Sequence, residues 1–300
     1  MSEVDMPSGP SDHPSELIAH FGPDGLRQFD KVSLVGTRLP AAAQAWLQGT
    51  GLPKAVSPYF TATPEGEAVR LEAAAARSEE PHPHELMRAW PRIGSDGLAH
   101  LCIRPDGAVQ GVILGTAADD MFVNTEVSTF GASLMALDRA LPLIATAPAF
   151  SQAAEVFRDL NMQLREIDAA AFAERESWWP RVLDDIRHTL NFPFSAAFEY
   201  VDAAGTKHVE TAATSPGAPH PEEIIWRRLT QSGLDPRQVI RIYCELEPCV
   251  MPGHYCAVWL QRTFPEAEFT HSYDYGDTAE SREEGLKQLI THTARESRRG

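Results

Sequence analysis

The sequence predicts two mixed domains in succession, a small α+β domain followed by a layered α/β domain. The chain has 300 residues, about twice the length that one compact core usually needs. Its first half alternates short apolar runs with turn sequences, whereas its second half alternates helical and strand-like segments. The predicted units are a polar, disordered N-terminus at 1–20, the α+β domain at 21–145, a connecting helix at 146–176 and the α/β domain at 177–300.

The composition favours a cytoplasmic globular protein. Hydrophobic residues make up 43% and charged residues 23% of the chain, and no apolar run approaches the about 18 residues of a membrane helix. Residues 1–14 lack the basic start and apolar stretch of a secretory signal, so we expect no contact with a membrane. The net charge of −16 is spread over both halves and argues against broad adhesion to a phosphate backbone.

The first half contains the signals of strands joined by tight turns. Turn sequences occur at 23–25, 95–97 and 105–107, each ending in Asp-Gly. They predict a hairpin that joins 99–103 to 109–114, and helical spacing predicts helices at 42–47 and 130–141. These elements together predict the α+β domain.

The order of turn and core residues along the first half resembles that of the SUKH superfamily of bacterial immunity proteins, in particular its SUKH-4-like branch. The residues that carry the likeness are Leu39-Pro40 with Trp46, Ile93-Gly94-Ser95-Asp96-Gly97, Asp106-Gly107-Ala108-Val109, and Phe122-Val123-Asn124 before Phe130. The likeness covers Phe21 to Leu141. It implies a domain that binds a partner protein, a toxin or an immunity protein, in a polymorphic toxin system.

The second half begins with helical patterns and continues with strands. Apolar residues at 156, 160, 164 and 167 lie on one side of a predicted amphipathic connecting helix. A further helix is predicted from Trp178 to Ile186, and strands at 196–201 and 207–212 precede alternating helices and strands. Alternation of this kind is typical of a layered α/β domain.

Two short motifs supply candidate metal ligands. A predicted strand at 239–246 runs directly into Pro248-Cys249, and Cys256 begins the next predicted helix. Upstream, Pro221 fits the first turn of a helix, which places His220 and Glu222 at that helix's amino terminus. One imidazole and two thiolates are ligands that zinc prefers. We therefore expect Zn²⁺ on His220, Cys249 and Cys256, with Glu222 as the catalytic proton carrier.

The order His-x-Glu, then Pro-Cys, then Cys is the signature of zinc-dependent nucleobase deaminases. The segments Tyr243-Cys244-Glu245-Leu246-Glu247-Pro248-Cys249 and Phe269-Thr270-His271-Ser272-Tyr273-Asp274-Tyr275-Gly276 resemble the toxin deaminases of bacterial polymorphic secretion systems. The likeness covers residues 178–296. It implies a three-layer, cytidine-deaminase-like fold and hydrolysis of the exocyclic amine of cytosine, with adenine as the second candidate, in a nucleic acid or a nucleotide.

Two features of the sequence leave other histidines as candidate metal ligands. Six residues separate Cys249 from Cys256 where many deaminases have two, which makes His254 a rival ligand. A second His-x-Glu, His208-Val209-Glu210, lies in a strand-like segment, and His220 ranks ahead of His208 because it begins a helix. The second functional hypothesis is an immunity or protein-binding module whose deaminase-like half is an inactive scaffold.

Overall fold

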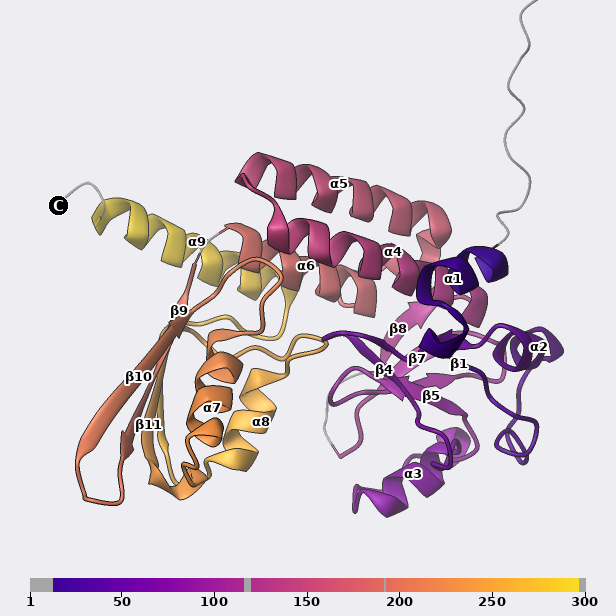
Figure 1. Cartoon of the computed structure of the whole chain (residues 1–300), viewed down its shortest axis with the longest axis horizontal. Coiled ribbons are helices and arrows are strands. Elements are labelled where there is room, and N and C mark those ends of the chain that lie inside the picture. Colours follow the sequence, from indigo (N-terminus) through magenta and orange to yellow (C-terminus); the bar gives the residue numbers. More distant parts are fainter. Residues whose placement is uncertain (1–12, 116–119, 192, 297–300) are drawn as a thin grey trace, which may run out of the picture.

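The computed structural model describes residues 13–115, 120–191 and 193–296 and contains two lobes, each built on its own sheet (Figure 1). The first lobe holds an antiparallel sheet in the order β3-β4-β5-β6-β7-β8. Its strands are β3 (Ala55–Val56), β4 (Phe60–Ala62), β5 (Arg92–Ser95), β6 (His100–Ile103), β7 (Val109–Val112) and β8 (Met121–Asn124). A separate pair joins β1 (Leu26–Arg27) to β2 (Leu52–Pro53).

The hairpin predicted from the Asp-Gly turn is the pair β6 and β7. Ile103 lies opposite Val109, and His100 lies opposite Val112. The turn is closed by the Asp106 side chain, which accepts a hydrogen bond from the Ala108 amide, while Gly107 adopts a φ of 98°. A positive φ at this position explains the glycine.

The first lobe also contains helices. They are α1 (His13–Phe21), α2 (Ala41–Gly49), α3 (Leu71–Arg77), α4 (Val127–Thr146) and α5 (Phe150–Ile167), with short 3₁₀ turns at Pro23–Gly25, Glu85–Met87 and Ala169–Phe172. The helices expected at 42–47 and 130–141 correspond to α2 and α4, and the amphipathic connecting helix corresponds to α5.

The N-terminal segment differs from its prediction. Residues 13–20, expected to be disordered, lie in α1, where Leu17 is fully buried and the helix packs against α4. Phe21 also packs against this core, and the His20 ring lies 2.7 Å from Asp138 of α4. Residues 1–12 of the expected disordered segment lie outside the described residues.

Helix α6 (Trp178–Asn191) connects the lobes. Its two tryptophans are fully buried in the first lobe, where the Trp178 indole donates to Asp96 and the Trp179 indole donates to Asn124. The apolar core of the first lobe continues along α6 as far as Leu190. The core thus extends past residue 177, where the sequence places the start of the second domain.

The second lobe has a four-stranded sheet in the order β10-β9-β11-β12. Strands β9 (Ser195–Val201), β10 (Lys207–Ala213) and β11 (Val239–Leu246) pair antiparallel, and β12 (Glu268–Tyr273) runs parallel to β11. The helices are α7 (Pro221–Gln231), α8 (Cys256–Thr263) and α9 (Ala279–Glu296), with a 3₁₀ turn at Pro236–Gln238.

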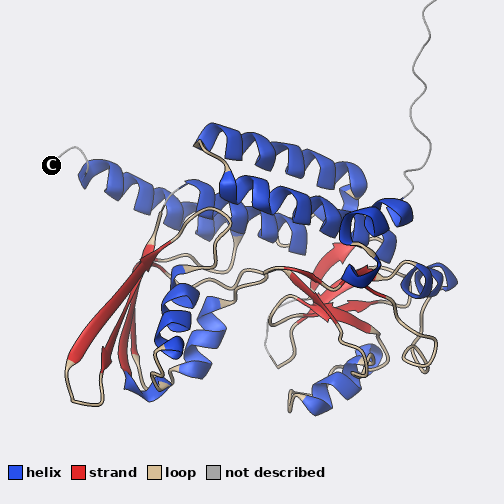
Figure 2. Cartoon of the chain, in the orientation of Figure 1, coloured by secondary structure: helices blue, strands red, loops and turns tan. Residues whose placement is uncertain are grey.

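The two faces of this sheet differ. Phe198 and Ile242 point into a core that includes Ile225 of α7 and Leu260 of α8, and Figure 2 shows these helices beside one face of the sheet. The opposite face carries polar residues in ion pairs, such as Glu199 with Arg241. The mixed sheet with flanking helices agrees with the prediction, and α9 also contacts β11 and β12.

Among the described residues, α4 is the one helix long and apolar enough to cross a membrane. However, 61% of its apolar window is buried inside the protein. It packs against α1, α2 and α5, as the core helix of a folded domain does.

Candidate metal centre

The start of α7 places His220 and Glu222 as the sequence predicts. His220 is the N-cap residue, and its amide donates to the Glu223 carboxylate over 2.8 Å, which completes a capping box. Pro221 occupies the first turn, where its missing N–H is not needed. This local geometry directs the His220 ring and the Glu222 side chain into the lobe, where both are buried.

Three side chains converge from three elements. The Nδ1 atom of His220 lies 3.5 Å from the Sγ atoms of both Cys249, after β11, and Cys256, the first residue of α8. The three donor atoms lie within 4.8 Å of one another, and exposure is 4% for His220, 6% for Cys249 and 0% for Cys256.

The distances suit a tetrahedral zinc ion. With Zn–S bonds of about 2.3 Å and Zn–N bonds of about 2.0 Å, tetrahedral geometry places the nitrogen about 3.5 Å from each sulfur. The nitrogen and sulfur donors are of the kind that zinc prefers. The residues present therefore fit this metal.

The longer segment between the cysteines folds back on itself. The Ala257 amide donates to the Cys249 carbonyl over 2.9 Å, and the Tyr255 amide donates to the Met251 carbonyl over 3.0 Å. These bonds bring the two sulfurs together despite the six residues between them. The rest of the segment packs against the first lobe: Tyr255 belongs to that lobe's apolar core, and Arg181 of α6 donates to the Val250 carbonyl over 2.6 Å.

Glu222 lies beside the cluster in a very small cavity. The Cys244 thiol hydrogen-bonds to its carboxylate, and its Oε2 atom has no hydrogen-bond partner among the described residues. Burial raises the pKa of the Glu222 carboxyl. The cavity has a volume of about 10 Å³ and is lined also by His220 and Cys249, which is room for about one water molecule.

The electrostatics favour a thiolate at one sulfur. Burial alone would raise the pKa of the Cys249 thiol, but a hydrogen bond from Cys256 and the charge of His220 together lower that pKa well below its usual value. A thiolate is the form of cysteine that binds metals.

The two rival histidines have partners other than the sulfurs. His208 is on β10, with Nε2 2.8 Å from Asp202 at the surface. His254 stacks on the His220 ring at a centroid distance of 3.8 Å, but its nitrogens face carboxylates, with Nδ1 2.7 Å from Glu223 and Nε2 3.3 Å from Asp185. In the described part of the chain, neither belongs to the cluster that contains the two sulfurs.

Asp185 is not among the residues that the sequence predicts for this site. Its Oδ1 atom lies 3.1 Å from Nε2 of His220, and its side chain is 3% exposed. One signal was present in the sequence: an acidic residue lies between the apolar Val182 and Ile186 on the buried side of a predicted amphipathic helix. Such a residue needs a buried partner.

The geometry describes a two-lobed protein whose second lobe carries a His/Cys metal-type centre, and comparison with known families agrees. A model described as Xanthomonas-like deaminase matches residues 193–292, so the C-terminal lobe is a deaminase-family domain. A model described as SUKH-4 immunity protein matches residues 13–185, more than half of the chain. The chain belongs to the SUKH-4 immunity protein family, and both resemblances noted in the sequence are confirmed. The chain has no significant match to a curated protein or to a solved structure.

Proposed function

We propose that this protein is a zinc-dependent deaminase that hydrolyses the exocyclic amine of cytosine, with adenine as the second candidate base, in a nucleic acid or a nucleotide. One observation carries the proposal: His220, Cys249 and Cys256 converge at distances suited to zinc while Glu222 lies beside them without being a ligand. This is the set of groups that deamination requires.

Each residue has a distinct task. His220, Cys249 and Cys256 would hold the metal and keep one position open. When bound, zinc supplies a water molecule of lowered pKa. Glu222 would take a first proton from the water at its carboxylate and give it to the ring nitrogen, which keeps it. It would then carry the second proton, from the hydroxyl added to the ring carbon, to the amine, which leaves as ammonia. Its raised pKa suits a group that must both accept and release a proton near neutral pH.

Substrate entry requires a movement. The cavity beside Glu222 holds about one water molecule, whereas a base needs far more room. Asp185, His188 and Thr189 of α6 line this cavity. A substrate base therefore enters when α6 or the loops around it move away from the deaminase lobe.

The setting that fits both family matches is a bacterial conflict system with polymorphic toxins. The SUKH-4 domain would bind a toxin or an immunity protein, and the protein would act in the cytoplasm. The second candidate function is an immunity or binding module whose deaminase-like half no longer turns over substrate. The small volume of the cavity beside Glu222 is the observation that favours this alternative.

Metal content followed by an activity screen tests the proposal. We expect about one zinc per chain, the stoichiometry of a three-ligand catalytic site, and ammonia release from at least one of single-stranded DNA, duplex DNA, RNA, cytidine and dCMP. Cys249→Ala should lose the metal, whereas the matched control Cys102→Ala, a buried thiol in the first lobe, should retain it. Zinc-free protein that is inactive on the whole panel would instead support the binding module.

A further inference from the structure

Asp185 joins the SUKH-4 domain to the candidate metal centre. It is the last residue that the SUKH-4 model matches, and it lies on α6, whose tryptophans are buried in the first lobe. The His220 ring that it approaches belongs to the second lobe, within the deaminase match. The contact therefore crosses from one family domain to the other.

Both carboxylate oxygens of Asp185 have partners. Oδ1 lies 3.1 Å from Nε2 of His220, while Oδ2 lies 3.3 Å from Nε2 of His254 and accepts a 2.7 Å hydrogen bond from the Tyr59 hydroxyl. Tyr59, immediately before β4, is itself buried in the first lobe's core. The Asp185 carboxylate thus accepts a hydrogen bond from the SUKH-4 lobe, through Tyr59, and contacts two histidines of the deaminase lobe.

The orientation of the His220 ring gives this contact a chemical meaning. Its Nδ1 atom faces the two sulfurs, and its Nε2 atom lies at ion-pair distance from Asp185, outside hydrogen-bond geometry and without another partner among the described residues. A carboxylate at Nε2 favours the tautomer with a proton on Nε2, so the lone pair on Nδ1 is free for a metal. Partners of this kind also raise the basicity of the ligand nitrogen.

Burial alone does not explain an aspartate at this position. A buried carboxylate loses its hydration, a cost that packing does not offset. The neighbouring residues Val182 and Ile186 of α6 contribute apolar side chains to the core, and an apolar residue at 185 would avoid the cost. The contacts with two imidazoles and a hydroxyl are what compensate the charge.

We infer that Asp185 is a positioning residue for the metal centre, supplied by the SUKH-4 domain, which orients His220 so that Nδ1 binds the metal. The inference rests on the proposed function for the identity of the metal. It makes the metal centre a composite of both domains, with affinity for zinc that depends on contacts from α6 and from Tyr59.

The test measures zinc affinity of the full-length protein by competition with a chelator. Asp185→Ala should weaken zinc binding by about 10- to 100-fold, the usual effect of removing such a partner. Asp185→Asn retains an acceptor oxygen and should recover part of the loss. Tyr59→Phe removes one hydroxyl and should weaken zinc binding through Asp185 by less than Asp185→Ala does. Thermal melts monitored by circular dichroism establish that each variant is folded.

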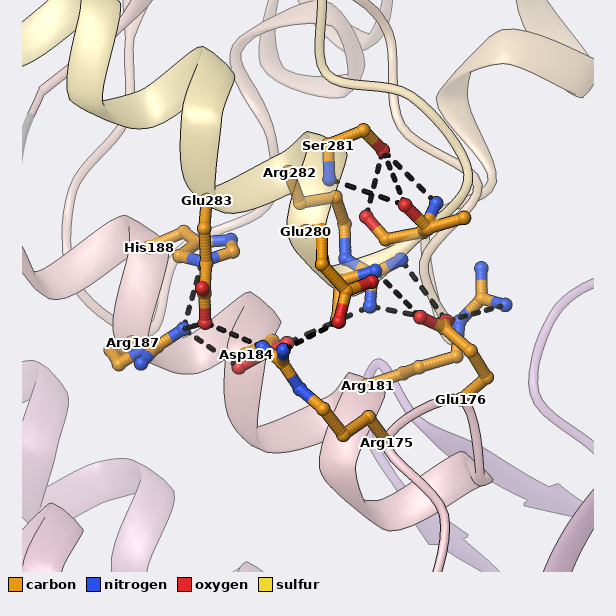
Figure 3. Close-up of polar contacts among 12 residues, drawn as sticks. Arg175, Glu176, Arg181, Asp184, Arg187, His188, Glu280, Ser281, Arg282 and Glu283 are labelled. Carbon is orange, nitrogen blue, oxygen red and sulfur yellow. Dashed lines mark hydrogen bonds and ion pairs between the residues drawn. The ribbon is translucent and has the colours of Figure 1, made fainter.

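The matched control is Asp184→Ala, the same change one residue earlier on the same helix. Asp184 faces a different group: Figure 3 shows it among the charged side chains that join α6 to α9, where it pairs with Arg187 over 2.9 Å. This variant should bind zinc like the wild type. Cobalt(II) provides a second readout, because a change in the orientation of His220 alters the visible spectrum at saturating metal, whereas a loss of packing elsewhere does not.

The outcomes separate this inference from the proposed function. If the wild type binds zinc and Cys249→Ala does not, but the Asp185 and Tyr59 variants stay within about twofold of the wild type, the inference is overturned and the deaminase proposal stands. Equal weakening by Asp184→Ala would also overturn it, since the effect would then be one of helix packing. Wild-type protein that takes up no zinc overturns both.

Discussion

Glu222 and Glu223 are adjacent carboxylates with different roles, because the start of α7 turns their side chains in different directions. Glu223 accepts from the His220 amide and contacts His254, and these contacts outweigh burial to lower its pKa. Glu222 points into the small cavity, where burial raises its pKa. The environment makes Glu223 the capping residue and suits Glu222 to the proton transfer that we propose.

Glu222→Gln separates metal binding from catalysis. Since Glu222 is outside the set of metal donors, the variant should retain its zinc, while kcat should fall by about 10²- to 10⁴-fold, the usual contribution of general acid–base catalysis. Glu210→Gln is the matched control, because Glu210 is the acid of the second His-x-Glu and pairs with Arg228 at the surface. Zinc analysis and ammonia release measure both variants. Unchanged turnover in Glu222→Gln would remove Glu222 from the mechanism.

At the scale of elements, α6 and α9 are joined by a network of charges (Figure 3). Arg282 of α9 is fully buried and donates to Glu176, just before α6, and to the Asp277 carbonyl. Arg175 is exposed and pairs with Glu280 and Glu283. The two arginines make similar contacts at different depths.

Burial predicts that these two arginines differ in their effect on stability. Arg282→Ala should lower the free energy of unfolding by about 3 kcal/mol, because it removes a buried charge from its partners. Arg175→Ala should change it little, because solvent screens an exposed pair. Urea unfolding followed by tryptophan fluorescence measures both. Equal losses would show that depth does not decide the strength of this network.

At the scale of the whole molecule, one buried carboxylate connects the sheet of the first lobe to the segment of the second that carries Cys249 and Cys256. Asp96 follows β5 and accepts hydrogen bonds from the Trp178 indole over 2.7 Å and from the Tyr255 hydroxyl over 2.8 Å. Tyr255 directly precedes Cys256. Movement of the lobes relative to each other would therefore displace the loop that positions both sulfurs.

The raised pKa of Asp96 predicts how the free energy of unfolding depends on pH. Burial raises the pKa of Asp96 from 3.8 to about 6, although the bonds from Trp178 and Tyr255 oppose the rise. Because the folded-state pKa is the higher one, its stabilising contribution is complete below pH 3.8 and is lost as the pH rises through 6. The loss amounts to about 3 kcal/mol. In urea unfolding at pH 4 and pH 7.5, wild type should lose this amount relative to Asp96→Asn, and parallel pH profiles would contradict the assignment.

Local signals account for the parts of the site that the sequence predicted. Pro221 indicated a helix start at His220 and Glu222, and the apolar run at 239–246 indicated a strand that ends just before Cys249. These features depend on residues a few positions apart, as helix and strand signals do. The order of the ligands and the two family resemblances followed from such short segments.

Other parts depend on residues far apart in the chain. Asp185 and Tyr59 are 126 residues apart, and Tyr255 lies in the core of the opposite lobe. No local pattern indicates which distant surfaces will pack. For the same reason the sequence did not show that α6 belongs to the first lobe's core or that one face of the second sheet carries ion pairs such as that of Glu199 with Arg241.

The sequence by itself determined the two families, the order of helices and strands around the motifs, and the residues with metal-binding chemistry, because these follow from side-chain type and short-range periodicity. Only the tertiary structure decided which histidine meets the sulfurs, how six residues between the cysteines are accommodated, and that an aspartate from the SUKH-4 domain approaches the ligand ring. Those results follow from how buried surfaces of the two lobes fit together, since a buried polar group takes whichever partner the packing brings within reach.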